Sequence, residues 1–394
     1  METSLSFESN GSTSVEHIPT AAANIASDDE RLESLVLYRI ASALWSICSP
    51  IIILLGTFGN VMTLVIMRRM TSSESSLNVY FTSLAVVDLI VLFTASLPEW
   101  LNVKIGFRLQ DTGTVSCKLF TWSSTGAGTM GSWFLVCLTL HRASAVVWPH
   151  RVNFLCTRRR VTGLIVGVAA FIATLYSHYI VGFDIVNVSN ASTTTTTMKC
   201  LMASPGYVHF VRDVFVYVEV AVYSLLPFAC LVLGNGVLVW KLSVSLREAR
   251  KNLTAGRAER VSARRGRAAK SVTLTVIVVS LTFVVLTLPV SFDYILSYIA
   301  REFLEVTGNE YAKVQLFYTV SVLLADCNSA VNFYLYCLTG RRFREEFLRV
   351  FGCGMSRCLP TATRELTVNS PRVKSSSRSW VAGFQGVCPL RQGS

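Results

Sequence analysis

Isolated polar and charged residues inside long apolar stretches are the groups of this 394-residue chain whose chemistry most needs an explanation. Asp88 lies in the middle of one such stretch, Asn60 in an earlier one, and Asn328, Ser329 and Asn332 in a later one. A charged group at the centre of a membrane costs about 2.5–3.5 kcal/mol on insertion scales, so it is normally retained for a function. Together these residues could form a hydrated polar centre, with Asp88 holding a cation such as sodium. The alternative is a hydrogen-bond network that only packs helices.

A second pattern separates a cysteine from an arginine by 25 residues, from Cys117 to Arg142. A helix of that length measures about 37 Å at ~1.5 Å per residue, and the hydrocarbon core of a bilayer is ~30 Å thick. The segment therefore places Cys117 at one membrane face and Arg142 at the other. Cys200 is the other cysteine that the topology below places outside, and a disulfide with Cys117 would close a loop of roughly 80 residues, worth ~4 kcal/mol in the chain-entropy model.

The elements that must position these residues are membrane helices. Hydrophobic residues make up 52% of the chain and charged residues only 15%, which is too little charge for a soluble protein of this size. Each apolar stretch has the spanning length of ~20 residues, and in lipid a helix satisfies its own backbone. We predict an all-α seven-transmembrane helix bundle with spans at 38–67, 77–98, 114–146, 160–183, 214–240, 271–299 and 313–337. The expected divisions are an extracellular tail at 1–37, the helix domain at 38–339, a short amphipathic cytoplasmic helix at 340–352 and a cytoplasmic tail at 353–394.

The distribution of charge predicts the orientation. The net charge is +12. The two long connections are residues 184–210 and 241–270, and the second of them carries ten Lys or Arg. Basic residues concentrate on the cytoplasmic side of membrane proteins, so we expect the acidic N-terminus outside and the C-terminus inside, and we exclude nucleic acid as a partner. Residues 1–35 have no apolar core, so the first helix would act as the insertion signal. Three glycosylation triplets would lie outside, at Asn10, Asn187 and Asn190.

Six motifs occur together in one order along the chain. They are Gly59-Asn60-Val61, Leu84-Ala85 with Asp88, Cys117 with Arg142, Phe283 with Pro289, Asn332 with Tyr336, and Phe343 with Phe347. With them, residues 36–352 resemble the rhodopsin-like (class A) family of G-protein-coupled receptors. The resemblance implies a plasma-membrane receptor, not an enzyme, whose partners are a heterotrimeric G protein, arrestin, receptor kinases and membrane lipids.

The resemblance also implies roles for particular residues. Ligand binding would shift the bundle between two arrangements, the sixth helix would swing about Pro289, and Arg142 would be freed for the G protein. The residues expected to couple this motion are His141, Arg142, Phe283, Pro289, Asn332 and Tyr336. Cys353 and Cys358 follow the amphipathic segment beside basic residues, where acyl chains would complete a membrane anchor; unmodified cysteines are the alternative.

The chain departs from the family pattern at several places. His141 and Ala143 flank the arginine where an acidic residue and a tyrosine are usual, and Asn235, Thr287 and Phe333 replace a tyrosine, a tryptophan and a proline. No Trp occurs in residues 160–183. Such a set is similar to invertebrate neuropeptide receptors of the FMRFamide-receptor-like group. Because the residue before Arg142 is uncharged, one restraint on the inactive state is absent, and we expect raised ligand-free signalling.

The nature of the ligand is constrained by residue types near the outer ends of the helices. Ser124 stands where amine receptors have an aspartate, and Asp326 where opsins have a lysine, which disfavours amines and retinal. Carboxylates with aromatic rings suit an amidated peptide carrying a cationic residue, although some of the carboxylates could simply be wet rim residues. The expected ligand-binding residues are Glu99, Trp122, Ser124, Tyr217, Glu219, Asp293 and Asp326. A receptor for a small non-peptide ligand and a non-coupling decoy receptor remain alternatives. A transporter or channel is disfavoured, because no inverted repeat is visible.

Overall fold

The computed structural model describes residues 21–70, 75–149, 151, 156–189, 196–251, 257–303 and 308–352. Within that part of the chain, seven helical segments are long and apolar enough to cross a membrane. They are Leu35–Arg69, Ser76–Ile105, Thr114–Val147, Arg158–Gly182, Pro205–Ser245, Ser271–Tyr294 and Ala312–Thr339. The predicted seven-helix membrane fold is therefore confirmed.

The first span lies in α1 (Ala21–Arg69), and the second consists of α2 (Ser75–Val91), η1 (Leu92–Ser96) and α3 (Leu97–Ile105). A short turn, η2 (Leu109–Thr112), leads to α4 (Thr114–Val147), the third span, and α6 (Arg158–Leu175) with α7 (His178–Gly182) makes the fourth. The fifth comprises α8 (Pro205–His209), η3 (Phe210–Phe215), α9 (Val216–Val220), η4 (Ala221–Leu225) and α10 (Leu226–Lys251). The sixth and seventh are α11 (Arg257–Phe303) and α12 (Gly308–Thr339), and α13 (Arg341–Gly352) follows.

Proline residues explain one π turn in the second span and one in the fifth. Pro98 and Pro227 each lie two residues beyond the end of a wide π turn, η1 and η4 respectively. Proline has no N–H and its ring collides with the carbonyl one turn earlier, so the preceding turn widens and the helix bends. By contrast, α11 continues through Pro289 as an α-helix.

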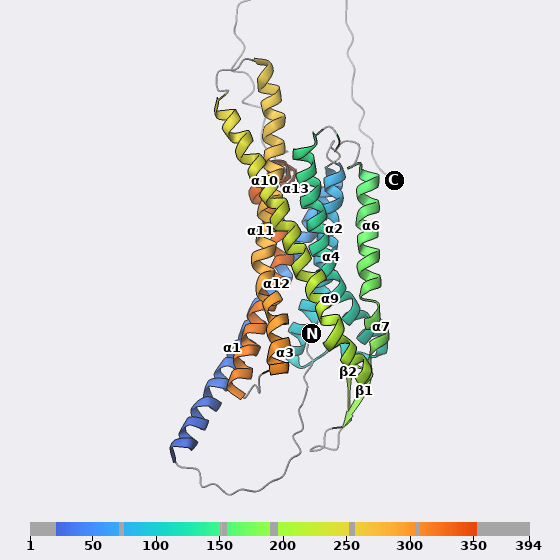
Figure 1. Ribbon diagram of the computed structural model, residues 1–394, viewed down its shortest axis with the longest axis vertical. Helices are drawn as coiled ribbons and strands as arrows, with labels where there is room; N and C mark the ends of the chain where they lie inside the picture. Colours follow the sequence, from blue (N-terminus) through green and yellow to red (C-terminus); the bar gives the residue numbers. More distant parts are fainter. Residues whose placement is uncertain are drawn as a thin grey trace, which may run out of the picture. The chain divides into compact units, whose positions relative to one another are not determined.

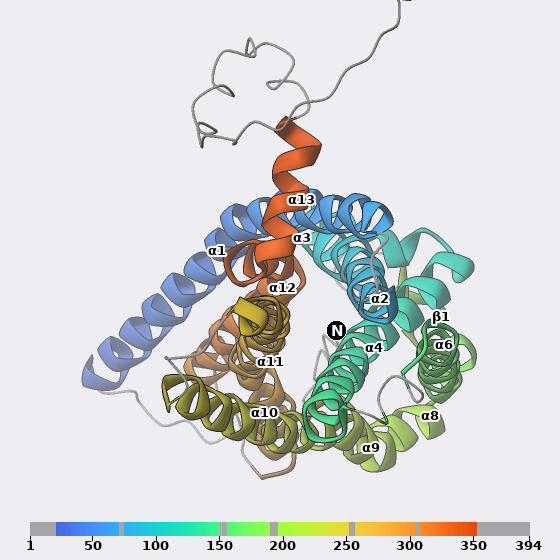
Figure 2. The same ribbon diagram turned by 90° about the horizontal axis from the view of Figure 1, so that it is seen from above.

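The third span, α4, lies at the centre of the bundle and packs against α2, α6, α10 and α11, as the view along the helices shows (Figure 2). The first span packs against the second and the seventh, and α11 lies along α12 (Figure 1). The largest apolar cluster joins these helices around Phe134, Leu138, Leu231 and Val276. The central position of α4 puts its polar residues within reach of most other spans.

After the seventh span the chain turns at Gly340 into α13, which runs across the end of α12 (Figure 2). A Cβ at residue 340 would lie 2.7 Å from the carbonyl oxygen of Tyr336, so glycine is required at this turn. Phe343 is buried, with its ring 5.7 Å from that of Phe333, whereas Arg341 and its basic neighbours are exposed. This segment therefore has the two faces that the sequence predicted.

Two connections differ from the sequence prediction. Residues 184–210 include an unpredicted antiparallel hairpin, in which β1 (Phe183–Ser189) pairs with β2 (Thr196–Met202). Residues 241–270, expected as a long connection, are mostly helical, because α10 extends to Lys251 and α11 begins at Arg257. That segment has no proline and is rich in Ala and Arg, both good helix formers, so the helices continue beyond the apolar spans.

Candidate functional site

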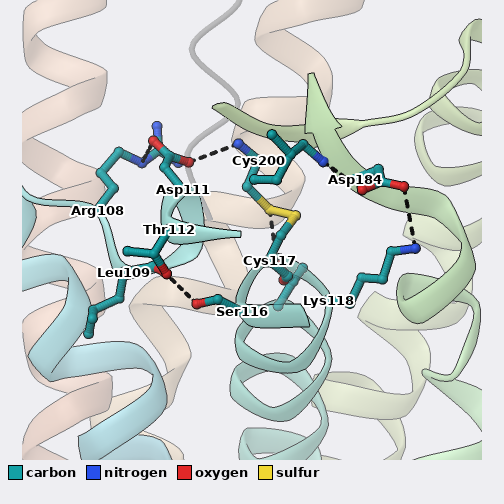
Figure 3. The surroundings of a disulfide bond; sticks show 11 residues. Arg108, Leu109, Asp111, Thr112, Ser116, Cys117, Lys118, Asp184 and Cys200 are labelled. Atoms are coloured by element: carbon teal, nitrogen blue, oxygen red, sulfur yellow. Dashed lines mark hydrogen bonds and ion pairs between the residues drawn. A yellow bond between two sulfur atoms is a disulfide. The ribbon is translucent and has the colours of Figure 1, made fainter. Parts of the chain in front are cut away.

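A disulfide joins Cys117, in the first turn of α4, to Cys200 in β2, with the two Cα atoms 5.4 Å apart (Figure 3). This confirms the predicted bridge. The backbone N–H of Cys200 donates to the carboxylate of Asp111 at 2.8 Å, and Arg108 lies 3.5 Å from the same carboxylate. The hairpin is thus fixed to the end of α4 by a covalent bond and by a hydrogen bond to a charged acceptor.

A second contact joins the other strand of the hairpin to α4. The ammonium group of Lys118 lies 3.4 Å from the carboxylate of Asp184 in β1 (Figure 3). The backbone N–H of Ile185 also donates to Asp184 at 2.8 Å, and this bond, with a smaller contribution from Lys118, holds the pKa of Asp184 below its usual value. The carboxylate is exposed, so this pair orients β1 more than it stabilises the protein.

Aromatic side chains fill the space between the hairpin and the helices. Tyr176 and Tyr179 stack with centroids 6.0 Å apart, and Phe215 meets both rings edge-on. Trp122 packs against this cluster and its N–H donates to the carbonyl of Ala173 at 3.1 Å. Trp122, one of the expected ligand-binding residues, therefore bonds the third span to the fourth through its indole nitrogen.

Three carboxylates are buried nearer the centre of the bundle, in its disulfide-bearing half. The exposed fractions are 6% for Glu219, 5% for Asp326 and 5% for Asp293. Tyr223 is close enough to interact electrostatically with both Glu219 and Asp326, and its ring lies 5.9 Å from that of Tyr294. The fifth, sixth and seventh spans thus bring acidic and phenolic groups together.

The second span completes one side of this acidic region. Ser96, in the π turn η1, and Glu99 both lie close to the carboxylate of Asp326. Glu99 is half-buried, whereas the Oδ2 atom of Asp326 is buried and has no hydrogen-bond partner among the described residues. A buried carboxylate oxygen without a partner is costly, so this position favours a group that can donate to it.

Two of the expected ligand-binding residues, Tyr217 and Ser124, are more exposed than the three buried carboxylates. Tyr217 is 57% exposed, and Ser124 is half-buried with its hydroxyl donating to the carbonyl of Thr121 in its own helix. Tyr223, which is not among the expected ligand-binding residues, is the tyrosine beside the carboxylates. It follows Glu219 by four residues and therefore shares its helix face, a spacing that could have identified it.

The polar residues of the bundle core meet across three spans. The amide of Asn332 donates to the carboxylate of Asp88 at 2.8 Å, and Asn60 donates to the backbone carbonyl of Ser329 at 2.8 Å. Asp88, Asn328 and Asn332 line a cavity of about 10 Å³ in which the centre of a water-sized sphere can move. That is close to the smallest volume that holds one water molecule. Whether a sodium ion occupies this centre stays a prediction.

The switch residues lie at the opposite end of the bundle from the disulfide. His141 and Arg142 are both buried, and the His141 ring meets Tyr80 edge-on with centroids 5.4 Å apart. Tyr336 packs between Phe81 and Phe343, at centroid distances of 4.8 and 5.6 Å.

Hydroxyl and amide groups join the fifth span to the sixth near these switch residues. Phe283 of the sixth span is buried and meets Phe228 of the fifth at 6.2 Å, whereas Pro289 is half-buried. Ser280 donates to the amide oxygen of Asn235 at 2.9 Å. Nearer the acidic region, the hydroxyl groups of Ser224 and Ser291 lie 2.7 Å apart. The sequence does not predict these contacts, although Asn235 departs from the family pattern.

The modification sites are only partly covered by the structure. Asn187 is exposed in β1, opposite Met198. Asn10, Asn190, Cys353 and Cys358 lie outside the described residues. Glycosylation and acylation therefore stay predictions.

Comparison with known proteins gives one family and several relatives. Residues 59–336 match the family model described as "7 transmembrane receptor (rhodopsin family)". The chain is 26% identical to the thyrotropin-releasing hormone receptor of Mus musculus over 337 residues, covering 82% of this chain and 83% of the relative. It is 26% identical to neuromedin-U receptor 2 of Rattus norvegicus, covering 80% and 77%, and 24% identical to growth hormone secretagogue receptor type 1 of Sus scrofa, covering 82% and 83%.

Proposed function

The chain belongs to the rhodopsin family of seven-transmembrane receptors and is a multi-pass plasma-membrane receptor rather than an enzyme; we propose that its ligand is an extracellular peptide carrying a positive charge. The relatives include receptors named for thyrotropin-releasing hormone and neuromedin U, which supports a peptide. The observation that carries the proposed charge is the burial of Glu219 and Asp326 beside tyrosines in the disulfide-bearing half of the bundle.

Electrostatics favours a cationic group at this site. An ionised carboxylate in a low-dielectric interior is stabilised only by a partner of opposite charge or by hydrogen-bond donors. A guanidinium or ammonium group of the ligand would supply both, and the rings of Tyr223 and Tyr294 offer aromatic faces to the same cation. A hydrogen bond to a charged group contributes about 1.5–3 kcal/mol, so each carboxylate would account for roughly ten- to a hundredfold in affinity.

The proposed mechanism is a shift between two arrangements of the bundle. The N-terminus and the hairpin lie outside the cell, and the basic ends of α10 and α11 lie in the cytoplasm. A bound peptide stabilises an arrangement in which the sixth span has swung outward about Pro289. Arg142 then becomes accessible to a heterotrimeric G protein at the cytoplasmic face, and receptor kinases and arrestin act on the tail afterwards.

The test is a calcium and cAMP screen of cells expressing the receptor against amidated neuropeptides, including peptides with and without Arg or Lys. Glu219→Gln and Asp326→Asn should each raise the half-maximal concentration of a cationic agonist by roughly ten- to a hundredfold. Asp213→Asn is the matched control, because Asp213 lies on the same span as Glu219 but is exposed, and its carboxylate is 2.9 Å from the guanidinium group of Arg212.

The outcomes separate the alternatives. Equal potency of neutral and cationic peptides, or unchanged potency in both carboxylate variants, would contradict the charge argument. Peptide binding without activation of any G protein would instead favour the decoy receptor, for which the altered His141-Arg142-Ala143 sequence is the motivating feature. Activation only by a small non-peptide compound would contradict the peptide assignment.

A further inference from the structure

Three hydroxyl groups join the sixth span to the seventh at the end of the bundle opposite the disulfide. The hydroxyl of Thr339, at the end of α12, donates to the hydroxyl oxygen of Thr275 in α11 at 2.8 Å. The hydroxyl of Thr275 donates in turn to the backbone carbonyl of Ser271 at 3.0 Å. The hydroxyl of Ser271 returns to α12 by donating to the backbone carbonyl of Thr339 at 2.9 Å.

Ser271 occupies the junction between two helix ends. The carbonyl of Thr339 belongs to the last turn of α12, and the N–H of Arg341 to the first turn of α13, so neither has a partner within its own helix. The Ser271 hydroxyl donates to the carbonyl of Thr339 at 2.9 Å and accepts from the N–H of Arg341 at 3.4 Å. The guanidinium group of Arg344 donates to the carbonyls of Cys337 and Leu338, at 2.9 and 2.6 Å. Ser271 therefore supplies the donor for the next carbonyl, that of Thr339.

We propose that Ser271, Thr275 and Thr339 form a hydroxyl clasp that holds the sixth span against the seventh and so restrains the receptor in its inactive arrangement. The inference rests on the outward swing of the sixth span proposed above. Such a swing removes Ser271 and Thr275 from α12, so every bond of the clasp between the two helices must break. The family resemblance implies an acidic residue before the switch arginine and a second one low in the sixth helix, which together would oppose this motion. Here uncharged His141 and Ala269 stand at those two positions. The clasp provides an uncharged restraint at the same end of the bundle.

The two helices contribute unequally to the clasp. Without Thr275 the Thr339 hydroxyl can still donate within its own helix, to the carbonyl of Leu335 at 2.7 Å, so Thr275→Val removes little more than the contact between helices. Ser271→Ala leaves both a carbonyl and an N–H without their partner in the closed arrangement. Because the serine substitution removes two hydrogen bonds from the sixth span to this junction and Thr275→Val removes one, the serine substitution should have the larger effect.

The first experiment measures nucleotide exchange without ligand in membranes that contain full-length receptor and a panel of G proteins, at equal surface expression. One net hydrogen bond changes an equilibrium by about two- to tenfold. We expect Thr275→Val to raise basal exchange by about that factor and Ser271→Ala to raise it further. Thr319→Val is the matched control, because this threonine lies on α12 and, among the described residues, its hydroxyl bonds only the carbonyl of Gln315 in its own helix.

The second experiment closes the same contact covalently. The hydroxyl oxygens of Thr275 and Thr339 are 2.8 Å apart, so Thr275→Cys with Thr339→Cys places two thiols where oxidation can join them. Oxidation of the cysteine pair should abolish G-protein activation, and reduction should restore it. Wild-type receptor that is oxidised and reduced in the same way is the control. Basal exchange like wild type in Ser271→Ala and Thr275→Val, together with full agonist activation of the oxidised cysteine pair, would overturn the clasp while leaving the receptor function intact. No G-protein activation in wild type or any variant, with or without peptide, would overturn the proposed function and the clasp with it.

Discussion

Breaking the bridge between Cys117 and Cys200 should remove ligand binding at the cell surface. The two cysteines are 83 residues apart, for which the chain-entropy model gives about 4.5 kcal/mol. That figure is an upper value, because α4 and α6 lie inside the loop and the membrane already restrains them. With about 2 kcal/mol as the lower end, the population in which the hairpin is fixed to α4 should fall by at least about thirtyfold, since 1.4 kcal/mol corresponds to a factor of ten.

The neighbouring contacts cannot replace the bond. The hydrogen bond from Cys200 to the carboxylate of Asp111 contributes about 1.5–3 kcal/mol, and it requires β2 to be in place already. The pair between Lys118 and Asp184 is exposed and screened by salt, so it adds little. We therefore expect Cys117→Ser and Cys200→Ser to abolish binding, and Asp111→Asn to weaken it.

The assay compares surface receptor, measured through an N-terminal epitope tag, with specific binding of a labelled agonist from the peptide screen. The double variant should be no worse than either single variant, because each substitution breaks the same bond. Cys156→Ser is the control, since Cys156 is a free cysteine outside the membrane spans. Additive losses for the two cysteines, or normal binding in either single variant, would refute this reasoning.

Two further predictions concern signalling and its termination. Arg142→Ala should keep surface expression and ligand binding but lose G-protein activation in the same nucleotide-exchange assay; full signalling would exclude Arg142 as the switch. Truncation after Leu359 should leave activation intact and slow agonist-induced loss of receptor from the surface, because it removes the serines interleaved with basic residues at 372–379. Internalisation at the full rate would point instead to residues 241–270.

Features that depend on hydrophobic length and on residue identity were predictable from the sequence. The seven spans could be located because a membrane helix is apolar all round and about 20 residues long, whichever way it faces. Cys117 and Cys200 could be paired because the topology leaves few cysteines outside. The connections were harder, because the hairpin and the extensions of α10 and α11 depend on backbone pairing and helix propensity beyond the membrane.

The rotation of each helix about its axis could not be predicted. In a membrane the lipid-facing and core-facing sides are both apolar, so no amphipathic pattern tells which residues face inward. For this reason the sequence does not indicate that Tyr223 lies beside the carboxylates, nor which groups Ser280 and Thr339 contact; Tyr217 as a ligand-binding residue stays a prediction. The resemblance to invertebrate FMRFamide-like receptors also stays a prediction, because the relatives reported above are vertebrate receptors.

The last prediction joins His141 to the clasp. His141→Asp would place a carboxylate beside Arg142 in a buried position, where an opposite charge should stabilise the inactive bundle and lower basal signalling several-fold. The substitution also removes the packing of His141 on Tyr80, so His141→Asn, which has the same shape as Asp without its charge, is the required comparison. Because His141 and the clasp bias one equilibrium between inactive and active bundles, their free energies should add, and His141→Asp should partly reverse the basal activity of Ser271→Ala. Equal baselines for the Asp and Asn variants, at matched surface levels, would show that charge at this position does not restrain the receptor.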